Sequence, residues 1–563
     1  MAAGLRDSDA GLLVLALVVG VATGAGAIGF RYAIEYLTLL FTGTRDYSAT
    51  PGDPHPWAPW LGPWFVLVTP VLAGLLHGPL VHAFAREARG HGVPEVMFAV
   101  ARRGGRIPAR VAAVKATASA LTIAGGGSVG REGPIVQIGA ALGSSLGGVA
   151  RVAEDRRTLL VACGAAGGIA ATFNAPLAGV VFAMEIVLRD FAARSFGMVV
   201  VSAVTASVVG RAVLGSQAFL DLPDFTVDHL LGYGLFALLG LLGGGAGVVF
   251  TRVLYAVEDA CDWLWRGPEW LRPAAGGGLL GLVLLAVPEM YGVGYPVLGN
   301  AVAGHYTIGF LLVLLVAKVV ATSLTIGIGG SGGVFAPSLF LGAALGAAFG
   351  QVGAELAPEL TGPPGAFALV GMAAVFAGAA RAPITAVLIV FELTGEYSLI
   401  LPLMTAVVLA TGTSHLLSRD SIYTAKLRRR GVDLDAPVRS WAHGRTVLSV
   451  LGAAPEPVRD DAPLAAAADL LRRSAASELP VVDAAGRYRG VLTSRAVADE
   501  LSRAGAGTVL DLMESRPTLT SGAAVADGLD LLDSHGLAGV AVLDDGRVVG
   551  WFSGQAVLSA VRG

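Results

Sequence analysis

Long apolar runs constrain the fold of this chain more than any other feature. They begin at Ala10, Trp64, Gly197, Leu230 and Ile308, and the longest reach the length of about 17–25 residues that a helix needs to cross a bilayer. Only 14 % of the 563 residues are charged, whereas an average soluble domain carries about 25 %. A soluble enzyme with a large core would not need so many runs of this length. The sequence therefore predicts an all-α polytopic membrane domain.

The character of the chain changes near residue 428. The basic segment "KLRRRGVDLDAPVRSWAHGR" contains no long apolar run, and the residues after it are typical of a soluble α/β domain. We expect a membrane domain over 1–430, a linker over 431–441 and a small α/β domain over 442–563. The basic linker and the basic loop 101–110 predict a multi-pass protein of the cell membrane with a cytoplasmic C-terminus, because positive residues favour that side.

The membrane domain contains an internal repeat. Residues 114–143 align without a gap with residues 317–346, and residues 164–185 align with residues 371–392. Paired repeats are common in transporters, whose binding sites lie where the repeats meet. The pattern predicts two homologous halves, over about 10–210 and 230–430. The alignment alone does not say whether the halves are inverted.

The tail repeats as well. Residues 457–494 are echoed by residues 517–553, and each unit is predicted to form a helix, a short strand, a turn and a second short strand. One such unit could hardly bury its own faces. We therefore expect two units, over about 445–503 and 508–563, that pack together.

Three glycine- and proline-rich segments interrupt the apolar sequence. They are "GHGVPE" (90–95), "GGGSVGREGP" (125–134) and "GGSGGVFAP" (329–337). Helix N-termini expose unpaired N–H groups and attract anions, and a broken membrane helix can aim its N-terminus at a buried ion. Conduction needs sites that hold an ion weakly enough to release it. The breaks predict a site that holds an anion mainly by backbone dipoles.

These motifs resemble those of the CLC family of chloride channels and chloride/proton exchangers. "GREGP" is similar to the gating-glutamate motif, "GHGVP" and "GVFAP" to the two filter segments, and "SIYTAKL" (421–427) to the late segment that carries a tyrosine. The tail resembles a pair of CBS domains. The resemblance implies two inverted halves with broken helices, followed by the CBS pair. It also implies a homodimer with one anion pathway per subunit.

The resemblance also implies roles for individual residues. Glu132 would be the gate, because an ionised carboxylate mimics chloride at the outer site and leaves when it is protonated or displaced. The hydroxyl of Tyr423 would contact the central anion. Backbone N–H groups of Val334 and Phe335 would complete the anion-binding site, to which His91, Gly92 and Val93 of the first filter segment would also belong. The transported partners would be chloride and, in an exchanger, protons.

Each of these residues could instead have a purely structural role. Glu132 could belong to a structural hydrogen-bond network, although an intramembrane carboxylate is usually functional. Tyr423 could be an interfacial anchor. His91 stands where most of the family has a serine. Its imidazole either offers an N–H to the anion or points away and leaves the contact to the neighbouring backbone.

Proton coupling distinguishes a chloride/proton exchanger from a passive chloride channel. The position of the family's internal proton-relay glutamate is Ile186, which cannot carry a proton. The adjacent Glu185 is a candidate relay, but its repeat partner Glu392 favours a structural role for both. We expect weakly coupled chloride/proton exchange, with a passive voltage- or pH-gated chloride channel as the alternative.

Other function classes find little support. Two G-x-S-x-G segments lack catalytic partners, so we expect no enzyme, and two cysteines support neither a disulfide framework nor a metal site. A net charge of −3 indicates no nucleic-acid partner. In the tail, Ala496 and Ala556 replace the acids that would bind a ribose, so we expect no cofactor and doubt an adenine nucleotide there. A nucleotide-sensing membrane protein is the remote alternative, and the duplicated filter motifs argue against it.

Overall fold

A computed structural model of the chain describes residues 8–215, 232–358, 362–432, 445–474, 477–502 and 508–562. The chain divides into two compact units, Met1–Val432 and Asp433–Gly563, and each is described here by itself. The predicted linker 431–441 lies almost wholly outside the described residues, and so does most of the junction between the two halves.

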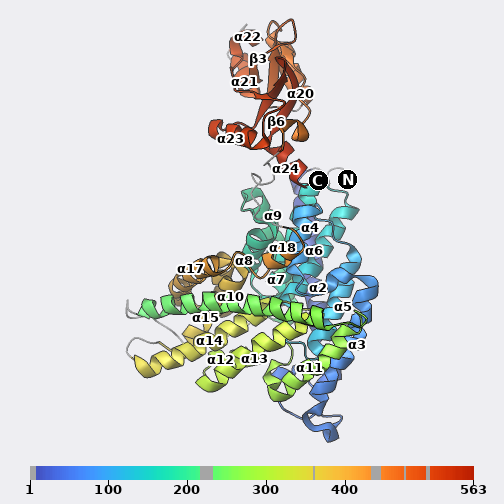
Figure 1. Cartoon of the computed structure of the whole chain (residues 1–563), viewed down its shortest axis with the longest axis vertical. Helices are drawn as coiled ribbons and strands as arrows, with labels where there is room; N and C mark the ends of the chain where they lie inside the picture. Colours follow the sequence, from blue (N-terminus) through green and yellow to red (C-terminus); the bar gives the residue numbers. More distant parts are fainter. Residues whose placement is uncertain are drawn as a thin grey trace. The chain divides into compact units, whose positions relative to one another are not determined.

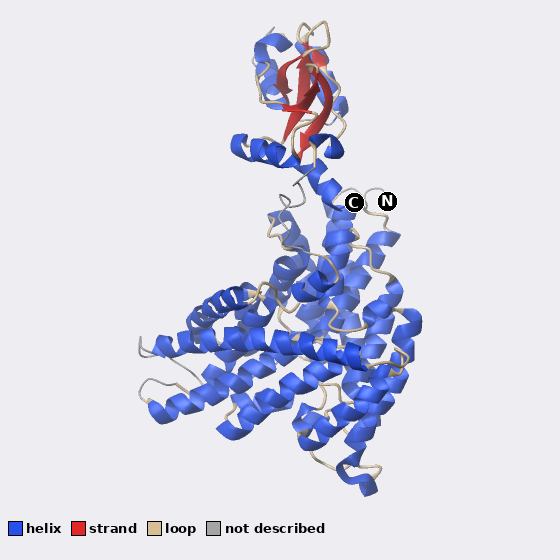
Figure 2. Ribbon diagram, in the orientation of Figure 1, coloured by secondary structure: helices blue, strands red, loops and turns tan. Residues whose placement is uncertain are grey.

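In its described residues, the first unit consists of helices joined by loops and has no named strand (Figure 2). Its first half consists of α2 (Asp9–Thr42), α3 (Phe65–Phe84), α4 (Val93–Arg102), α5 (Ala109–Ala124), α6 (Glu132–Val149), α7 (Glu154–Phe173), α8 (Pro176–Phe182) and α9 (Ala193–Leu214). Its second half consists of α10 (Gly232–Leu264), α11 (Arg272–Ala286), α12 (Tyr295–Val302), α13 (Ile308–Gly327), α14 (Phe335–Leu356), α15 (Pro364–Ala380), α16 (Pro383–Thr394) and α17 (Ile400–Leu417), and α18 (Thr424–Arg429) closes the unit.

The two halves repeat each other helix by helix in their order along the chain. Figure 1 colours the helices of the first half from blue to teal and those of the second from green to orange. A long first helix, α2 or α10, is followed by one of intermediate length and then by a short one, α4 or α12. The remaining helices pair in the same order, from α5 with α13 to α9 with α17. The element order agrees with the repeat predicted from two aligned segments and continues it from α2–α9 to α10–α17.

Seven helices within the described residues are long and apolar enough to cross a membrane. Five of them contain the apolar runs found in the sequence. The other two, Phe335–Leu356 and Tyr397–Leu417, were missed, because alanine, glycine and threonine dilute their apolar character. The predicted polytopic membrane domain is confirmed.

Several helices are too short to span a bilayer, as the prediction of broken helices requires. Within the two halves the shortest are α8 with 7 residues and α12 with 8, and α18 after them has 6, against about 20 for a spanning helix. A proline stands in the first turn of α4, α8, α12 and α16. Proline suits this position because its missing N–H would have no partner there.

Glycines bring neighbouring helices into close contact at equivalent places in the two halves. Gly139 of α6 packs against Gly164 of α7, and a Cβ on either residue would overlap the carbonyl oxygen of the other. Gly342 of α14 and Gly371 of α15 repeat this arrangement. Small residues let membrane helices approach closely, so these crossings fix the positions of α6 and α14, the two helices that begin at the filter motifs.

The second unit contains two similar three-stranded sheets (Figure 2). The elements of the first are β1 (Val458–Arg459), α20 (Leu464–Ser474), β2 (Glu478–Val482), β3 (Tyr488–Thr493) and α21 (Ser494–Ser502), and α22 (Val509–Leu512) follows. The elements of the second are β4 (Leu519–Thr520), α23 (Val525–His535), β5 (Gly539–Asp544), β6 (Arg547–Ser553) and α24 (Gly554–Arg562). The first strand of each sheet pairs in parallel with the second, which pairs in antiparallel with the third.

Each sheet has its own apolar core. Val481 and Leu492 lie in the first core, and Val542 and Phe552 lie in the second. The segment just before the first sheet packs into the second core through Val447, and Gly452 pairs there with Trp551. The two units of the tail are therefore joined by their flanking segments as well as by sequence order.

Candidate functional site

The three glycine-rich segments meet in the middle of the membrane unit. Gly130 and Gly333 exchange two backbone hydrogen bonds, of 2.8 and 2.6 Å. Gly90 pairs with the segment around Ser331, where its N–H donates to the carbonyl of Gly330 at 3.2 Å. Breaks that are far apart in the sequence therefore form one site, at the interface between the halves.

Two buried lysines hold the loops around this site. The Nζ of Lys115 donates to the carbonyl oxygens of Ala88 and Gly90, at 2.9 and 2.7 Å. Its repeat partner, Lys318, donates to Ser128 Oγ at 2.9 Å and to the carbonyl of Val293 at 3.0 Å. Each lysine therefore fixes the loop that precedes a short helix of its own half, α4 or α12.

Hydroxyl groups link the two halves reciprocally. Thr325 Oγ1, on α13, accepts from the backbone N–H of Ser128, while Thr122 Oγ1, on α5, accepts from the N–H of Ser331. These four residues are two repeat pairs, so each half closes the loop of the other.

Glu132 is the first residue of α6 and is fully buried. The hydroxyl of Tyr295, the first residue of α12, donates to its Oε1. The backbone N–H of Ala336, in the first turn of α14, donates to its Oε2 at 3.4 Å. The carboxylate therefore lies where α6, α12 and α14 all begin, and these helix ends favour a negative charge.

A large cavity leads toward this carboxylate. It has a volume of about 930 Å³ and reaches Tyr295 and Arg131, the residue before Glu132. The Arg131 guanidinium lies over the Tyr295 ring, 5.0 Å from its centroid. The charged residues of the cavity wall are Arg31, Glu35, Arg45, Asp46, Arg131 and Arg211. Arginines outnumber acids, so the cavity favours anions.

The other predicted site residues lie close to these loops. Gly92 has a φ of +86° and packs against Gly133 and Gln137 of α6, so a side chain there would be strained and crowded. Val93 begins α4. Val334 and Phe335 stand at the start of α14, and the Phe335 ring packs 4.3 Å from that of Phe376.

Tyr423 is 2 % exposed and directly precedes α18. Its neighbour Ile422 is fixed from two sides, since its N–H donates to the carbonyl of Ala379 at 2.8 Å and its carbonyl accepts from the Tyr255 hydroxyl at 2.5 Å. The Tyr423 ring is therefore held in place through its backbone. Among the described residues, no hydrogen-bond partner of its hydroxyl is found.

The comparisons with known proteins agree with this geometry. Residues 73–415 match the family model described as voltage gated chloride channel, and residues 453–503 match that of the CBS domain. The chain belongs to the CLC family. This confirms the resemblance drawn from the filter motifs and from the tail.

Individual relatives extend the likeness. The H(+)/Cl(-) exchange transporter ClcA of Vibrio parahaemolyticus is 37 % identical over 424 residues, which cover 74 % of this chain and 89 % of the relative. The crystal structure of a slow cyanobacterial Cl⁻/H⁺ antiporter matches with a TM-score of 0.68 at 27 % identity, over 74 % of this chain and 97 % of that one. A eukaryotic CLC transporter shares the fold over 96 % of this chain and 97 % of its own, with a TM-score of 0.65 at 22 % identity.

His91 is the residue that we expect to depart from the usual CLC filter. Its side chain is 3 % exposed, and neither ring nitrogen finds a hydrogen-bond partner among the described residues. Its ring lies 6.0 Å from that of Tyr255. A buried imidazole normally forms hydrogen bonds, so the His91 ring has an N–H donor available that no described residue uses.

Glu185 and Glu392 occupy reciprocal positions between the halves. The Glu185 carboxylate accepts from the N–H of Ile384 at 3.2 Å and from that of Thr385 at 2.9 Å, at the start of α16. Glu392 accepts from the N–H groups of Leu177 and Ala178 at the start of α8, at 3.0 and 2.7 Å. Each carboxylate therefore caps a helix of the other half, which is the structural role that the repeat suggested.

Ile186, at the position where the family's proton-relay glutamate is expected, lies in an irregular segment. Ile186, 5 % exposed, belongs to a π-helical turn, Ala183–Leu188, that continues α8. Isoleucine offers no proton there.

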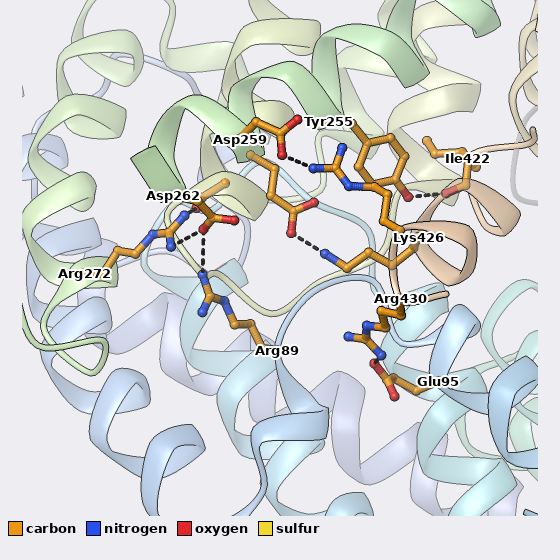
Figure 3. A network of polar contacts seen from close by, with 12 residues as sticks. Arg89, Glu95, Tyr255, Asp259, Asp262, Arg272, Ile422, Lys426 and Arg430 are labelled. Carbon is orange, nitrogen blue, oxygen red and sulfur yellow. Dashed lines mark hydrogen bonds and ion pairs between the residues drawn. The ribbon is translucent and has the colours of Figure 1, made fainter. Parts of the chain in front are cut away.

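Charged side chains surround the end of α10 (Figure 3). Lys426 and Arg429 of α18 pair with Glu258 and Asp259 of α10, and Arg430 pairs with Glu95 of α4. Nearby, Arg89 and Arg272 both approach Asp262. The pairs of Lys426, Arg429 and Arg430 tie the segment that follows Tyr423 to α10 and to α4, the helix that follows His91.

Sequence reasoning missed Tyr295 and Ala336, the two residues that donate hydrogen bonds to Glu132. Tyr295 had a signal. The segment "GVGYP" (292–296) repeats "GHGVP" (90–94) in the second half, about 200 residues further along the chain. For Ala336 the sequence contains no signal beyond the motif to which it belongs, because its backbone N–H and not its side chain contacts Glu132.

Proposed function

We propose that this protein exchanges chloride for protons across a membrane and that Glu132 is its gate. The observation that carries the proposal is the position of this carboxylate, fully buried at the beginnings of α6 and α14 and below an arginine-rich cavity. Such a place suits an anion. The likeness to the Vibrio exchange transporter and to the cyanobacterial antiporter supports exchange.

The carboxylate and chloride compete for the same place in this mechanism. An ionised Glu132 accepts from the N–H of Ala336 and blocks the outer end of the path. Protonation removes its charge, so the helix ends hold it less tightly and an anion replaces it. One group thus responds both to protons and to chloride, which is what exchange requires.

The inner part of the path would use the remaining predicted residues. The Tyr423 hydroxyl would donate to the central anion, together with backbone N–H groups from two filter segments. We propose that the His91 imidazole adds an N–H donor there, because its buried ring has no other partner among the described residues. The residues that supply backbone groups are Gly92, Val93, Val334 and Phe335.

A passive chloride channel is the second candidate. Ile186 cannot relay a proton, and both oxygens of Glu185 accept hydrogen bonds from the start of α16. Exchange must then bring cytoplasmic protons to Glu132 by water or by another group, whereas a channel needs no such route.

Liposomes that contain the purified protein distinguish the two candidates. Chloride and pH gradients are opposed, and the reversal potential and proton movement are recorded together. Exchange predicts uphill proton movement driven by chloride, and a reversal potential that depends on both gradients. A reversal potential set by chloride alone, with no uphill proton movement, would establish a channel.

We also propose a homodimer in the cell membrane, with the CBS-containing tail in the cytoplasm. Helices α8, α9, α16 and α17 carry exposed apolar side chains that a second copy could cover, among them Leu177, Val208, Ile384, Leu401 and Val408. Mass measurement in lipid nanodiscs tests the dimer. Protease accessibility of the tail in sealed, oriented vesicles tests its side.

A further inference from the structure

Tyr295 contacts Glu132, the proposed gate, but lies outside all the sequence motifs that predicted the anion site. Its ring packs between the Arg131 guanidinium, 5.0 Å from the ring centroid, and Phe173, whose ring centroid lies 6.4 Å away. Its hydroxyl donates to Glu132 Oε1. Tyr295 also lines the large cavity, so it stands between the gate and the space outside it.

The local sequence fixes the direction of this side chain. Gly294 has a φ of +85°, a conformation that glycine adopts readily, and Pro296 stands in the first turn of α12. The carbonyl of Val293 is bound by Lys318 Nζ at 3.0 Å. A tyrosine that begins such a fixed helix loses little further freedom when it binds Glu132.

The repeat isolates what is special about this position. In the first half the equivalent residue is Val93, which follows Gly92 and precedes Pro94 in the same way. Valine offers no hydrogen bond. The chain therefore carries a hydroxyl donor at the start of α12 and an apolar side chain at the start of α4.

We propose that Tyr295 is a positioning residue for the gate, whose hydroxyl holds the carboxylate of Glu132 in the outer anion site. This rests on the proposed role of Glu132 as the gate. The Tyr295 hydroxyl donates a hydrogen bond to Oε1 of the carboxylate, and the N–H of Ala336 donates one to Oε2. The strength of this hydrogen bond then sets how readily protons or chloride release the gate.

The direction of the effect follows from the chemistry of the bond. A tyrosine O–H donates more strongly to an ionised carboxylate than to a neutral acid. The hydroxyl therefore favours the ionised, blocking form of Glu132. Without it, protonation releases the gate at a higher pH. The other charged or titratable groups of the neighbouring elements are His91, Lys115, Arg131, Lys318 and Tyr423, with Arg31, Glu35, Arg45, Asp46 and Arg211 in the cavity wall.

The test replaces Tyr295 with phenylalanine and measures the pH dependence of chloride flux in liposomes. Tyr295→Phe keeps the ring under Arg131 and removes only the hydroxyl. We expect the pH of half-maximal flux to rise by about one unit, since a tenfold change in the protonation equilibrium corresponds to one pH unit. A purely structural role would lower flux equally at every pH. Tyr295→Leu also removes the hydroxyl and should move the profile in the same direction.

Two controls make the result specific. Tyr306→Phe removes a nearby hydroxyl that contacts Asn300, and its pH profile should match that of the unaltered protein. In a Glu132→Ala background, Tyr295→Phe should cause no shift, because the partner is gone.

The outcomes separate this inference from the proposed function. If Glu132→Ala retains the normal pH profile, then Glu132 is not the gate and the proposed function fails. If Glu132→Ala abolishes the pH dependence but both Tyr295 variants keep the normal profile, then Tyr295 does not position the gate.

Discussion

At the residue scale, Glu132 is held without an ion pair to either buried lysine. Lys115 and Lys318 bind carbonyl and hydroxyl oxygens of the loops, and Arg131 lies over the Tyr295 ring. Glu132 instead accepts from one backbone N–H and one hydroxyl. A buried salt bridge costs several kcal/mol to break, whereas this arrangement can release the carboxylate without leaving a charged partner alone.

The first prediction concerns that release. Glu132→Gln keeps the size of the side chain but cannot ionise, so it removes the competition between proton and chloride. We expect uphill proton movement to fall to the background level while chloride flux persists and becomes insensitive to pH. Parallel recording of pH and chloride in liposomes checks this. Unchanged pH dependence in the variant would exclude Glu132 as the gate.

The second prediction concerns His91. If its N–H contacts the anion, His91→Leu should weaken chloride binding by roughly five- to tenfold, since one hydrogen bond contributes about 1–1.5 kcal/mol. His91→Ser retains a donor and should bind more tightly than the leucine variant. Calorimetric titration with chloride, in a Glu132→Gln background that removes the competing carboxylate, measures both. Equal affinities in all three proteins would leave the contact to the backbone alone.

At the element scale, the halves hold each other by exchanged contacts. α5 and α13 cross-bond to the opposite loops through Thr122 and Thr325, and α8 and α16 exchange their capping carboxylates. An approximate two-fold relation between the halves produces such pairs. The anion-binding loops therefore depend on both halves at once, and neither half could form the site alone.

The third prediction follows from the exchanged caps. Glu185→Gln and Glu392→Gln each weaken hydrogen bonds to a helix N-terminus, so each should lower stability by about 1–2 kcal/mol. Neither should change the ratio of protons to chloride. Thermal unfolding in detergent and coupled flux in liposomes measure the two effects. Each variant is the control for the other, and slower proton flux in Glu185→Gln alone would instead make Glu185 the relay.

The fourth prediction concerns turns of the tail. Backbone N–H groups of Arg487 and Ala485 donate to Asp483 and lower the pKa of its carboxyl below its usual range, and the N–H and hydroxyl of Thr508 do the same for Asp511. A lowered folded-state pKa adds stability that is present above the unfolded value, near 4. That stability is lost as the pH falls through the folded-state value.

We therefore expect the unfolding temperature of the tail, residues 445–563, to be steady between about pH 7 and 5 and to fall below about pH 4. Circular dichroism during heating checks this. Asp483→Asn and Asp511→Asn should each flatten the fall. A fall of the same size in both variants would mean that other carboxyl groups cause it.

Some features of the fold and of the site could be predicted from the sequence, and others could not. The repeat and the glycine-rich breaks can be seen in the sequence itself, so they predicted two homologous halves and the loops that meet at Gly130 and Gly333. The hydrogen bond between Glu132 and Tyr295 depends on how α6 and α12 pack, which no local pattern contains. In the tail, the short strands β1 and β4 were missed because two residues carry no periodicity.

At the scale of the whole molecule, transport and tail are separate compact units. All the residues proposed for anion binding lie before residue 432, and the tail has two apolar cores of its own. We therefore expect the tail to be regulatory or structural and to supply no group to the anion path.

The last prediction decides between those two. In the tail, Thr493 Oγ1 accepts from the N–H of Ala496 and Ser553 Oγ accepts from that of Ala556, each at 3.2 Å, at the starts of α21 and α24. Both hydroxyls thus cap helices, and both alanines lack the carboxylate that would accept from ribose hydroxyl groups.

We expect ATP and AMP to bind the full-length protein weakly or not at all, and to leave chloride flux unchanged at millimolar concentration. Ala496→Asp with Ala556→Asp restores an acceptor at each position and should strengthen binding if the site is otherwise intact. Calorimetry on the protein in detergent measures both. Tight, stoichiometric binding to the unaltered protein would make the tail a nucleotide sensor that recognises the ribose by other groups.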